Sequence, residues 1–235
     1  MTMAWTEHRH ADADAAAQGL AHALAQDVAV ALATEANAVV ALAGGRTPFA
    51  AYRLLARQPL DWCRIHLLPG DERCVPHDHH ACNATALRKA FDGTGAIVEH
   101  LTVPSGDPDA SLMHARTLLG THSGPFASVV LGMGLDGHVA SLFAGAPQFM
   151  TALHPRDGAA VARIDPEPLP VEAPFPRITL TLPRLLDARR VHLLVTGHEK
   201  RSVLEAAMAA NAPLLLPVSA VLHAPESNVQ IHWSP

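Results

Sequence analysis

The stretch AVVALAGGRTP, residues 38–48, decides the fold class. Its first six residues are continuously apolar, as expected of a short strand that is buried on both faces of a sheet. The two glycines that follow break the strand, and Thr47 and Pro48 suit the cap and the first turn of a helix. A buried strand that passes directly into a helix is typical of parallel sheets covered by helices.

The same alternation continues on both sides of this stretch. An Ala-rich helix precedes it, and helices are predicted to begin at Asn83, at Asp107-Pro108 and at His198. Further strands are predicted at Arg64–Leu68, Ala127–Leu131, Ile178–Leu182, Val191–Thr196 and Val229–Trp233. The Pro-rich stretch Asp165–Pro176 is interpreted as a surface loop. We therefore expect one α/β domain over residues 1–235, with α/β/α layers around a mostly parallel, Rossmann-like sheet.

Composition excludes several classes of function. The net charge of −5, without any Lys/Arg-rich run, argues against a nucleic-acid partner. No apolar stretch approaches the roughly 20 residues that span a bilayer, and no signal peptide is visible, so we expect no membrane association. The three cysteines have no zinc-ribbon spacing, which favours reduced thiols in a cytoplasmic protein. The expected partner is a small molecule.

The most specific stretch is Leu131–Phe143, LGMGLDGHVASLF. Its three closely spaced glycines indicate an unusual backbone path after a strand, ending in Asp136 and His138 just before a predicted helix. Histidine is the side chain best suited to take a proton from water near neutral pH, and a nearby carboxylate can orient its ring. These two residues are the candidate catalytic pair. A structural turn with an exposed histidine is the alternative interpretation.

Three other strand ends carry residues that suit an anion. Gly44 and Gly45 permit close approach of the backbone, Thr47 offers a hydroxyl, and Arg46 adds a charge beside a helix start. Arg73, in the loop Gly70–Pro76, could clamp a phosphate with two hydrogen bonds. Lys200 lies in the first turn of a helix, where a cation is slightly unfavourable unless an anionic ligand is near. A plain turn, an ion-paired turn and a solvated lysine are the respective alternatives.

One cluster suggests a metal and is set aside. His77-Asp78-His79-His80 contains good ligand types, but adjacent residues in a loop rarely converge on one ion. No second ligand set has suggestive spacing. We expect no native metal, and only adventitious binding at His77–His80.

With these loops in place, the sequence resembles the 6-phosphogluconolactonase family over nearly the whole chain. The stretches that carry the resemblance are Gly44–Pro48, Asp71–Pro76, Leu131–Phe143, Arg177–Pro183, Gly197–Lys200 and Ile231–Trp233. The third is highly specific, and the others occur in the order found in the family. One departure is Arg46, where the family usually has Ser.

The resemblance implies hydrolysis of 6-phospho-D-glucono-1,5-lactone to 6-phosphogluconate, in the pentose phosphate pathway, without metal or cofactor. It also implies that His138 is the base with Asp136 as its neighbour. Carried over by position, the residues that hold the substrate, chiefly its phosphate, are Gly44, Gly45, Thr47, Arg73 and Lys200, with Arg46 in place of the usual Ser. We expect a monomer.

Two rival functions belong to related folds. Amino-sugar phosphate deaminases use an acid at the position of Asp71 and usually follow the loop histidine with Ala-Phe-Asn-Glu. Here Ser141-Leu142-Phe143 stands in that place, and Arg73 replaces their usual aromatic residue. A sugar-phosphate-sensing regulator would need a helix-turn-helix and a basic surface, and neither is visible. The residues at Ser141–Phe143 and Arg73, and the lack of a visible DNA-binding motif, favour lactone hydrolysis over the two rivals.

Overall fold

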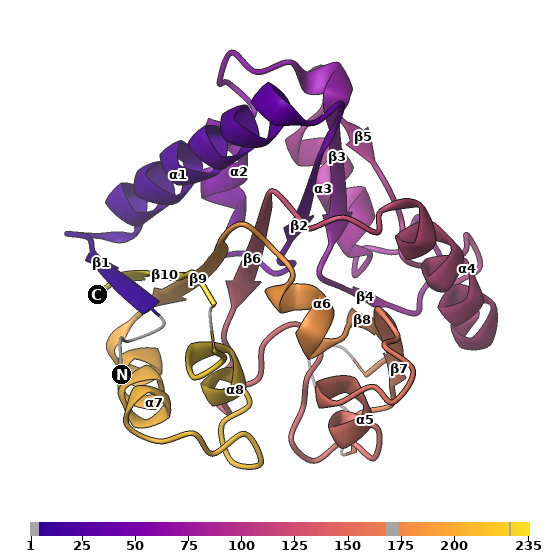
Figure 1. Cartoon of the computed structure of the whole chain (residues 1–235), viewed down its shortest axis with the longest axis vertical. Helices are drawn as coiled ribbons and strands as arrows, with labels where there is room; N and C mark the ends of the chain where they lie inside the picture. The colour runs from indigo at the N-terminus through magenta and orange to yellow at the C-terminus, as the bar shows by residue number, and fades with distance from the viewer. Residues whose placement is uncertain (1–4, 168–173, 226) are drawn as a thin grey trace.

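A seven-stranded sheet forms the centre of the protein (Figure 1), in a computed structural model that describes residues 5–167, 174–225 and 227–235. The strands run in the spatial order β1 (Trp5–Arg9), β10 (Val229–Ser234), β9 (Val191–Thr196), β6 (Ser128–Gly132), β2 (Ala38–Leu42), β3 (Ile65–Pro69) and β5 (Ile97–Val98). Every neighbouring pair is parallel, which confirms the predicted Rossmann-like sheet.

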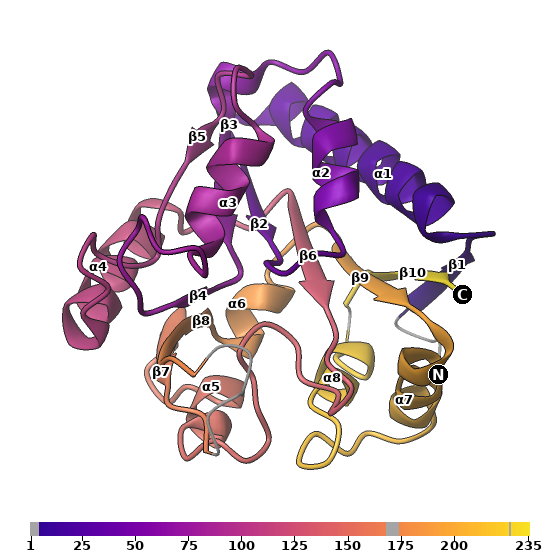
Figure 2. The same cartoon turned by 180° about the vertical axis from the view of Figure 1, so that it is seen from behind.

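Helices cover both faces of this sheet, as predicted. One face carries α1 (Ala13–Thr34), α2 (Phe49–Leu55) and α3 (Asn83–Ala90), and a short 3-10 helix spans Trp62–Arg64. The other carries α4 (Pro108–Thr121), α7 (His198–Ala209), α8 (Val218–Leu222) and the short helices α5 (Phe149–Leu153) and α6 (Leu182–Leu186). Figures 1 and 2 show α1 and α2 on one side, with α7 and α8 opposite. Each layer buries its own hydrophobic cluster against the sheet.

A second, antiparallel sheet corrects one prediction. Its order is β4 (Asp71–Arg73), β8 (Arg177–Leu180) and β7 (Val161–Ile164). The run Ile178–Leu182 was expected to be a strand of the parallel sheet, but β8 belongs here. All four β8 residues are buried, although the sequence RITL alternates polar and apolar residues, a pattern more typical of an antiparallel strand.

Capping residues explain some helix starts and correct others. Asp12 and Asp107 accept hydrogen bonds from Ala15 N and Ala110 N, both at 2.8 Å, and cap α1 and α4, of which the start at Asp107 was predicted. Thr47 does not cap α2, which begins at Phe49 without a side-chain cap.

Within the described residues, no helix combines the length and the apolar composition needed to cross a membrane.

The strand order positions a ligand site. From β2 the chain moves outward to β3 and β5, and then returns to place β6 on the other side of β2. The connections that follow β2 and β6 therefore diverge, and a crevice opens at the carboxyl ends of these two strands.

Candidate active site

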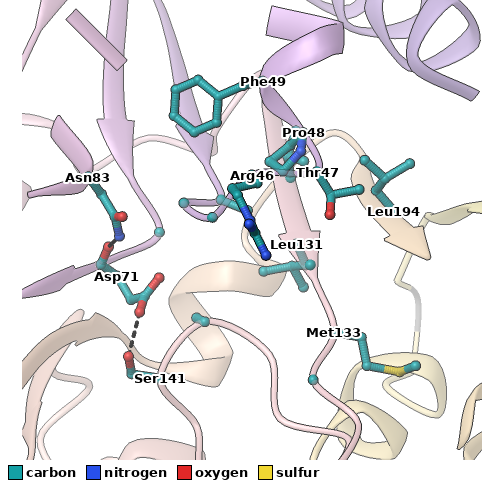
Figure 3. A pocket seen from close by; sticks show the side chains of 18 of the residues that line it. Arg46, Thr47, Pro48, Phe49, Asp71, Asn83, Leu131, Met133, Ser141 and Leu194 are labelled. Atoms are coloured by element: carbon teal, nitrogen blue, oxygen red, sulfur yellow. Dashed lines mark hydrogen bonds between the residues drawn. The ribbon is translucent and has the colours of Figure 1, made fainter. Parts of the chain in front are cut away.

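A cavity of about 1210 Å³ opens at this crevice (Figure 3). Its lining comes from the segments that follow β2, β3, β6 and β9, together with α3 and β8. The predicted site residues that line it are Gly44, Gly45, Arg46, Thr47, Arg73, His138 and Lys200. Asp136 does not line the cavity and contacts His138 instead. The fold thus brings together four loops that are far apart in the sequence.

The loop after β6 is held by its own backbone. Gly134 N donates to His138 O at 2.9 Å, and Gly137 N donates to Gly134 O at 3.1 Å. Val218 N, at the start of α8, donates to Gly137 O at 2.8 Å. No helix follows immediately, contrary to the prediction, because the next one is α5 at Phe149. The glycine-rich segment is a compact turn that fixes His138.

Asp136 and His138 form a hydrogen-bonded pair in this turn. The distance from His138 Nδ1 to Asp136 Oδ1 is 2.6 Å, and His138 N also donates to this oxygen at 3.2 Å. The hydrogen bond from His138 is the main cause that lowers the pKa of Asp136. Because an ionised carboxylate only accepts, Nδ1 carries the proton in the neutral ring. Nε2 is then left with a lone pair.

The side chains of His138 and Asp136 differ in exposure and in position relative to the cavity. The His138 side chain is 31% exposed and lines the cavity, whereas Asp136 is 62% exposed on the outer side of the turn. The Phe143 ring packs against the imidazole with centroids 4.5 Å apart. Only the imidazole is therefore placed to contact a molecule in the cavity.

Glycine is sterically required beneath this pair. A Cβ atom on Gly134 would lie 2.2 Å from His138 Nδ1 and 2.4 Å from Asp136 Oδ1. Two residues after His138, Ala140 adopts a positive φ of 48°, a strained conformation for a residue other than glycine. The turn bends there between His138 and Ser141, both of which line the cavity.

The loop after β2 forms another wall. A Cβ on Gly44 would lie 2.2 Å from Asn83 Oδ1, so only glycine lets the loop pass this side chain. Gly45 has φ +83°, a conformation that glycine adopts freely. Figure 3 shows Arg46 extending into the cavity beside Thr47. Both side chains are exposed there.

Strand β4 points its residues in alternating directions. Asp71 and Arg73 line the cavity, while Glu72 is buried on the opposite face. The Glu72 carboxylate accepts hydrogen bonds from the backbone N–H groups of Arg73, Asn83 and Ala84, each at 2.8 Å. Burial raises the pKa of Glu72 to about 7, against the opposing effect of these donors. This carboxylate joins β4 to the first turn of α3, whose N-cap residue Cys82 makes no side-chain cap.

Arg73 is not part of an ion-paired turn. Among the described residues, no ion pair joins its guanidinium to Asp71 or Glu72, and Nη1 donates to Ala81 O at 2.8 Å. The alternative interpretation of the Gly70–Pro76 loop is therefore wrong.

Besides Arg73, the cavity lining includes four further residues that were not selected as site residues from the sequence. Ser141 Oγ donates to Asp71 Oδ2 at 2.5 Å, and Asn83 Nδ2 donates to Asp71 O at 2.8 Å (Figure 3). Arg177 is buried and stands directly opposite Arg73 in the β4–β8 ladder. Burial is the first cause that lowers the pKa of Arg177, and the charge of Arg73 adds to it. The sequence pointed to Arg177 only as the first residue of the stretch Arg177–Pro183.

Positive charge dominates the cavity. Its charged lining consists of Arg46, Arg53, Arg73, Arg177 and Lys200, with Asp71 as the one carboxylate among the described residues. Lys200 lies in the first turn of α7, after Gly197 at φ +90°. Arg73 and Arg177, which lie opposite one another in the β4–β8 ladder, carry like charges that repel unless an anion lies between them. A chain of net charge −5 thus carries a local site suited to an anionic ligand.

The histidines at 77–80 do not converge on one point. His77 Nε2 lies 2.9 Å from Thr102 O, and His79 Nδ1 accepts from Ala81 N at 3.1 Å. His80 lines the cavity. Cys63, Cys74 and Cys82 are all free thiols. Within the described part of the chain, potential metal ligands converge at another place, away from this cavity.

Comparisons with known proteins agree with the family resemblance found in the sequence. The family described as glucosamine-6-phosphate isomerases/6-phosphogluconolactonase matches residues 11–233. A 6-phosphogluconolactonase of Pseudomonas putida is 36% identical over 97% of this chain and 92% of its own length. One from Pseudomonas aeruginosa is 38% identical over 93% of this chain and 90% of its own. The crystal structure of a 6-phosphogluconolactonase from Shewanella baltica superposes with a TM-score of 0.90 at 28% identity, covering 98% of this chain and 97% of the other.

Proposed function

The chain belongs to the glucosamine-6-phosphate isomerase/6-phosphogluconolactonase family, and we propose that it hydrolyses 6-phospho-D-glucono-1,5-lactone to 6-phosphogluconate, a step of the oxidative pentose phosphate pathway. The family resemblance drawn from the sequence is thereby confirmed. The observation that carries the proposal is the Asp136–His138 pair at the wall of a cavity lined by cations. This arrangement joins one base to a site for a charged substrate group.

The phosphate of the substrate would lie among the cations. Arg73 and Lys200 supply charge, Arg46 adds a third cation, and Thr47 offers a hydroxyl from the neighbouring loop. Charge-assisted hydrogen bonds to phosphate are about twice as strong as neutral ones. Gly44 and Gly45 keep the wall free of side chains, so the backbone of this loop can approach the substrate closely. Binding at this end would place the lactone ring toward His138.

His138 would act as a general base. Nε2 removes a proton from a water molecule while the water oxygen attacks C1 of the lactone. Asp136 holds Nδ1–H and stabilises the imidazolium that forms. The tetrahedral intermediate then collapses, the bond from C1 to the ring oxygen breaks, and the imidazolium returns its proton to that oxygen. The products are a carboxylic acid, which ionises, and a free hydroxyl.

No covalent intermediate is needed. Ser141 is the hydroxyl nearest to this chemistry in sequence, but its Oγ donates to Asp71 and it lacks the Gly-x-Ser-x-Gly turn of serine hydrolases. Because a lactone carbonyl is already electrophilic, one base and good positioning can suffice. Backbone N–H groups of the loop after β6 would stabilise the oxyanion.

The test is a direct assay of two substrates. We expect the purified protein to accelerate hydrolysis of 6-phosphogluconolactone above its spontaneous rate, and to leave glucosamine 6-phosphate unchanged. Release of ammonia from glucosamine 6-phosphate, without acceleration of lactone opening, would overturn the proposal in favour of the deaminase branch of the family. Acceleration of neither reaction would also contradict it.

A further inference from the structure

A cluster of three metal-binding side chain types lies outside the cavity, at the β3–β5 edge of the sheet. His66 Nδ1 lies 3.3 Å from Glu99 Oε1, and His122 Nε2 lies 2.7 Å from Glu99 Oε2. One potential ligand atom from each residue lies within 4.8 Å of the others. We propose that His66, Glu99 and His122 form a binding site for a divalent transition metal ion, with Zn²⁺ as the best-fitting species.

The spacing of the three atoms suits zinc. Bonds of about 2.0–2.1 Å in a tetrahedral arrangement separate neighbouring ligand atoms by about 3.3 Å. The observed separations, each to a different oxygen of Glu99, are 3.3 Å, which equals that value, and 2.7 Å, which is below it, so coordination needs only small rotations of the side chains. The two imidazoles can become ligands in their neutral form, with the proton moved to the other ring nitrogen. No ligand has to cross the fold.

The ligand types select the class of ion. Two imidazoles and one carboxylate suit zinc and neighbouring transition metals, whereas magnesium and calcium prefer sites made of oxygen. The side chains of His66, Glu99 and His122 are 17, 19 and 11% exposed, so the site is reached by solvent. Three protein ligands leave one position of a tetrahedron, which water would fill.

Three separate elements hold the ligands in place. His66 is in β3, where it pairs with Ile97 of β5, and Glu99 N donates to Leu67 O at 2.9 Å just beyond β5. His122 closes α4, and its carbonyl accepts from Nη2 of the buried Arg184 at 2.7 Å. A ligand set whose backbone is fixed before the ion arrives loses little conformational entropy on binding. The ion would cross-link β3, β5 and α4.

The site is distinct from the catalytic one. His66 lies near the start of β3, and Asp71 follows its end, so about 16 Å of extended chain separates them. None of the three ligands lines the cavity. The proposed ion is therefore structural, and the proposal does not depend on lactone hydrolysis.

The test is a zinc titration of the metal-stripped protein against a competing chelator, with Zn²⁺ alone as the probe. We expect one equivalent to bind tightly and to raise the Tm, because an ion that binds the folded state stabilises it. His122→Gln and, separately, Glu99→Gln should weaken this binding at least about 100-fold. Co²⁺ in place of zinc should give the intense visible absorption of a four-coordinate ion in the wild-type protein, and His122→Gln and Glu99→Gln should lose this absorption.

Matched variants separate this site from other histidines, since the chain contains sixteen. His22→Gln removes an exposed histidine of α1, and His138→Gln removes a loop histidine that is also paired with a carboxylate. Both should retain the tight site. Equal zinc binding by His122→Gln, Glu99→Gln and wild type would mean an adventitious ion only and would overturn the proposal, as would the absence of any tight equivalent. Metal-free Tm values near wild type would show that the variants fold.

Discussion

The imidazole of His138 and the carboxylate of Asp136 are joined through Nδ1 and Oδ1 at 2.6 Å, directly over the α-carbon of Gly134. This contact is made within one turn, and the turn itself is tied to α8 by Val218 N. The position of the ring is therefore set by backbone that is already in place before a ligand enters. Preorganisation of this kind lets a single base act efficiently.

Gly134→Ala tests that relationship. The added Cβ would lie 2.2 Å from His138 Nδ1, so the ring and the carboxylate must both move. We expect kcat for lactone hydrolysis to fall about 100-fold, since a displacement of about 1 Å has that effect on a positioned catalytic group. Gly120→Ala is the matched control, because a Cβ there meets nothing within 4 Å. Equal kcat values for the two variants would show that the turn does not position the base.

Asp136→Asn removes the charge and keeps the shape. The carboxylate accepts from His138 and would stabilise the imidazolium formed when water is deprotonated. Loss of a charge-assisted hydrogen bond costs about 1.5–3 kcal/mol, so kcat should fall about 10- to 100-fold while KM changes little. Asp92→Asn alters an exposed acid outside the cavity and should leave both constants unchanged. An Asp136→Asn enzyme with wild-type kcat would restrict Asp136 to a structural role.

Lys200→Ala should weaken substrate binding. Its ammonium group lines the cavity, and phosphate contacts persist from the ground state to the transition state, so KM should rise about tenfold with kcat nearly constant. The KM of the wild-type enzyme should also rise with ionic strength, because salt screens these charges. Steady-state kinetics of Lys200→Ala beside Arg57→Ala, an exposed arginine outside the cavity, gives the comparison. A fall in kcat alone would move Lys200 from binding to chemistry.

Arg46→Ala should have a smaller effect in the same direction. Arg46 is exposed, and exposed charge pairs contribute at most about 1 kcal/mol, so KM should rise no more than about fivefold. Arg46→Ser would test whether the residue usual in the family serves equally well. If Arg46→Ala raises KM as much as Lys200→Ala does, the arginine is a principal phosphate ligand in this chain.

Stability should fall in acid through a buried chain of histidines. Asp27, His192, His232 and His10 are linked in series at 2.8, 3.1 and 3.2 Å. Burial, followed by the neighbouring imidazoles, lowers the pKa of His232 from 6.5 to about 3. Because the folded pKa is below the unfolded one, protons favour the unfolded state. Above about pH 6.5 the neutral His232 costs the folded protein no stability. As the pH falls from 6.5 toward 3, the free energy of unfolding decreases.

The measurement is the Tm between pH 7.5 and pH 5. At pH 5 this residue alone should cost up to about 2 kcal/mol, at about 1.4 kcal/mol per pH unit below 6.5. His232→Gln should flatten the dependence, whereas the exposed His22→Gln should keep it. An unchanged slope in His232→Gln would place the acid sensitivity elsewhere.

The sequence predicted the parts of the fold that depend on local pattern. The strand at residues 38–42 and the helix after Asp107 follow from an unbroken apolar run and from an Asp-Pro start. The pattern could not assign β8 to its sheet, because the alternation in its sequence RITL does not reveal which strands lie beside it. The edge strand β1, with its mostly polar residues, had no apolar signal.

The residues of the candidate site also fall into two groups: those identified by local sequence and those that only the fold brings together. His138 and Asp136 are neighbours in sequence, so local chemistry identified them together. Arg177 meets Arg73 only through the β4–β8 ladder, which the sequence did not reveal. His66, Glu99 and His122 converge from separate elements, so ligand spacing along the chain could not find them.

The central claim, that His138 is the base of a lactone hydrolase, is tested most directly by the kcat of His138→Ala. Initial rates should be measured with saturating 6-phosphogluconolactone, after subtraction of spontaneous hydrolysis, at a temperature where the variant retains the wild-type Tm. General base catalysis contributes about 10²–10⁴-fold, so kcat should fall by that factor. A folded His138→Ala enzyme with kcat near wild type would contradict the account.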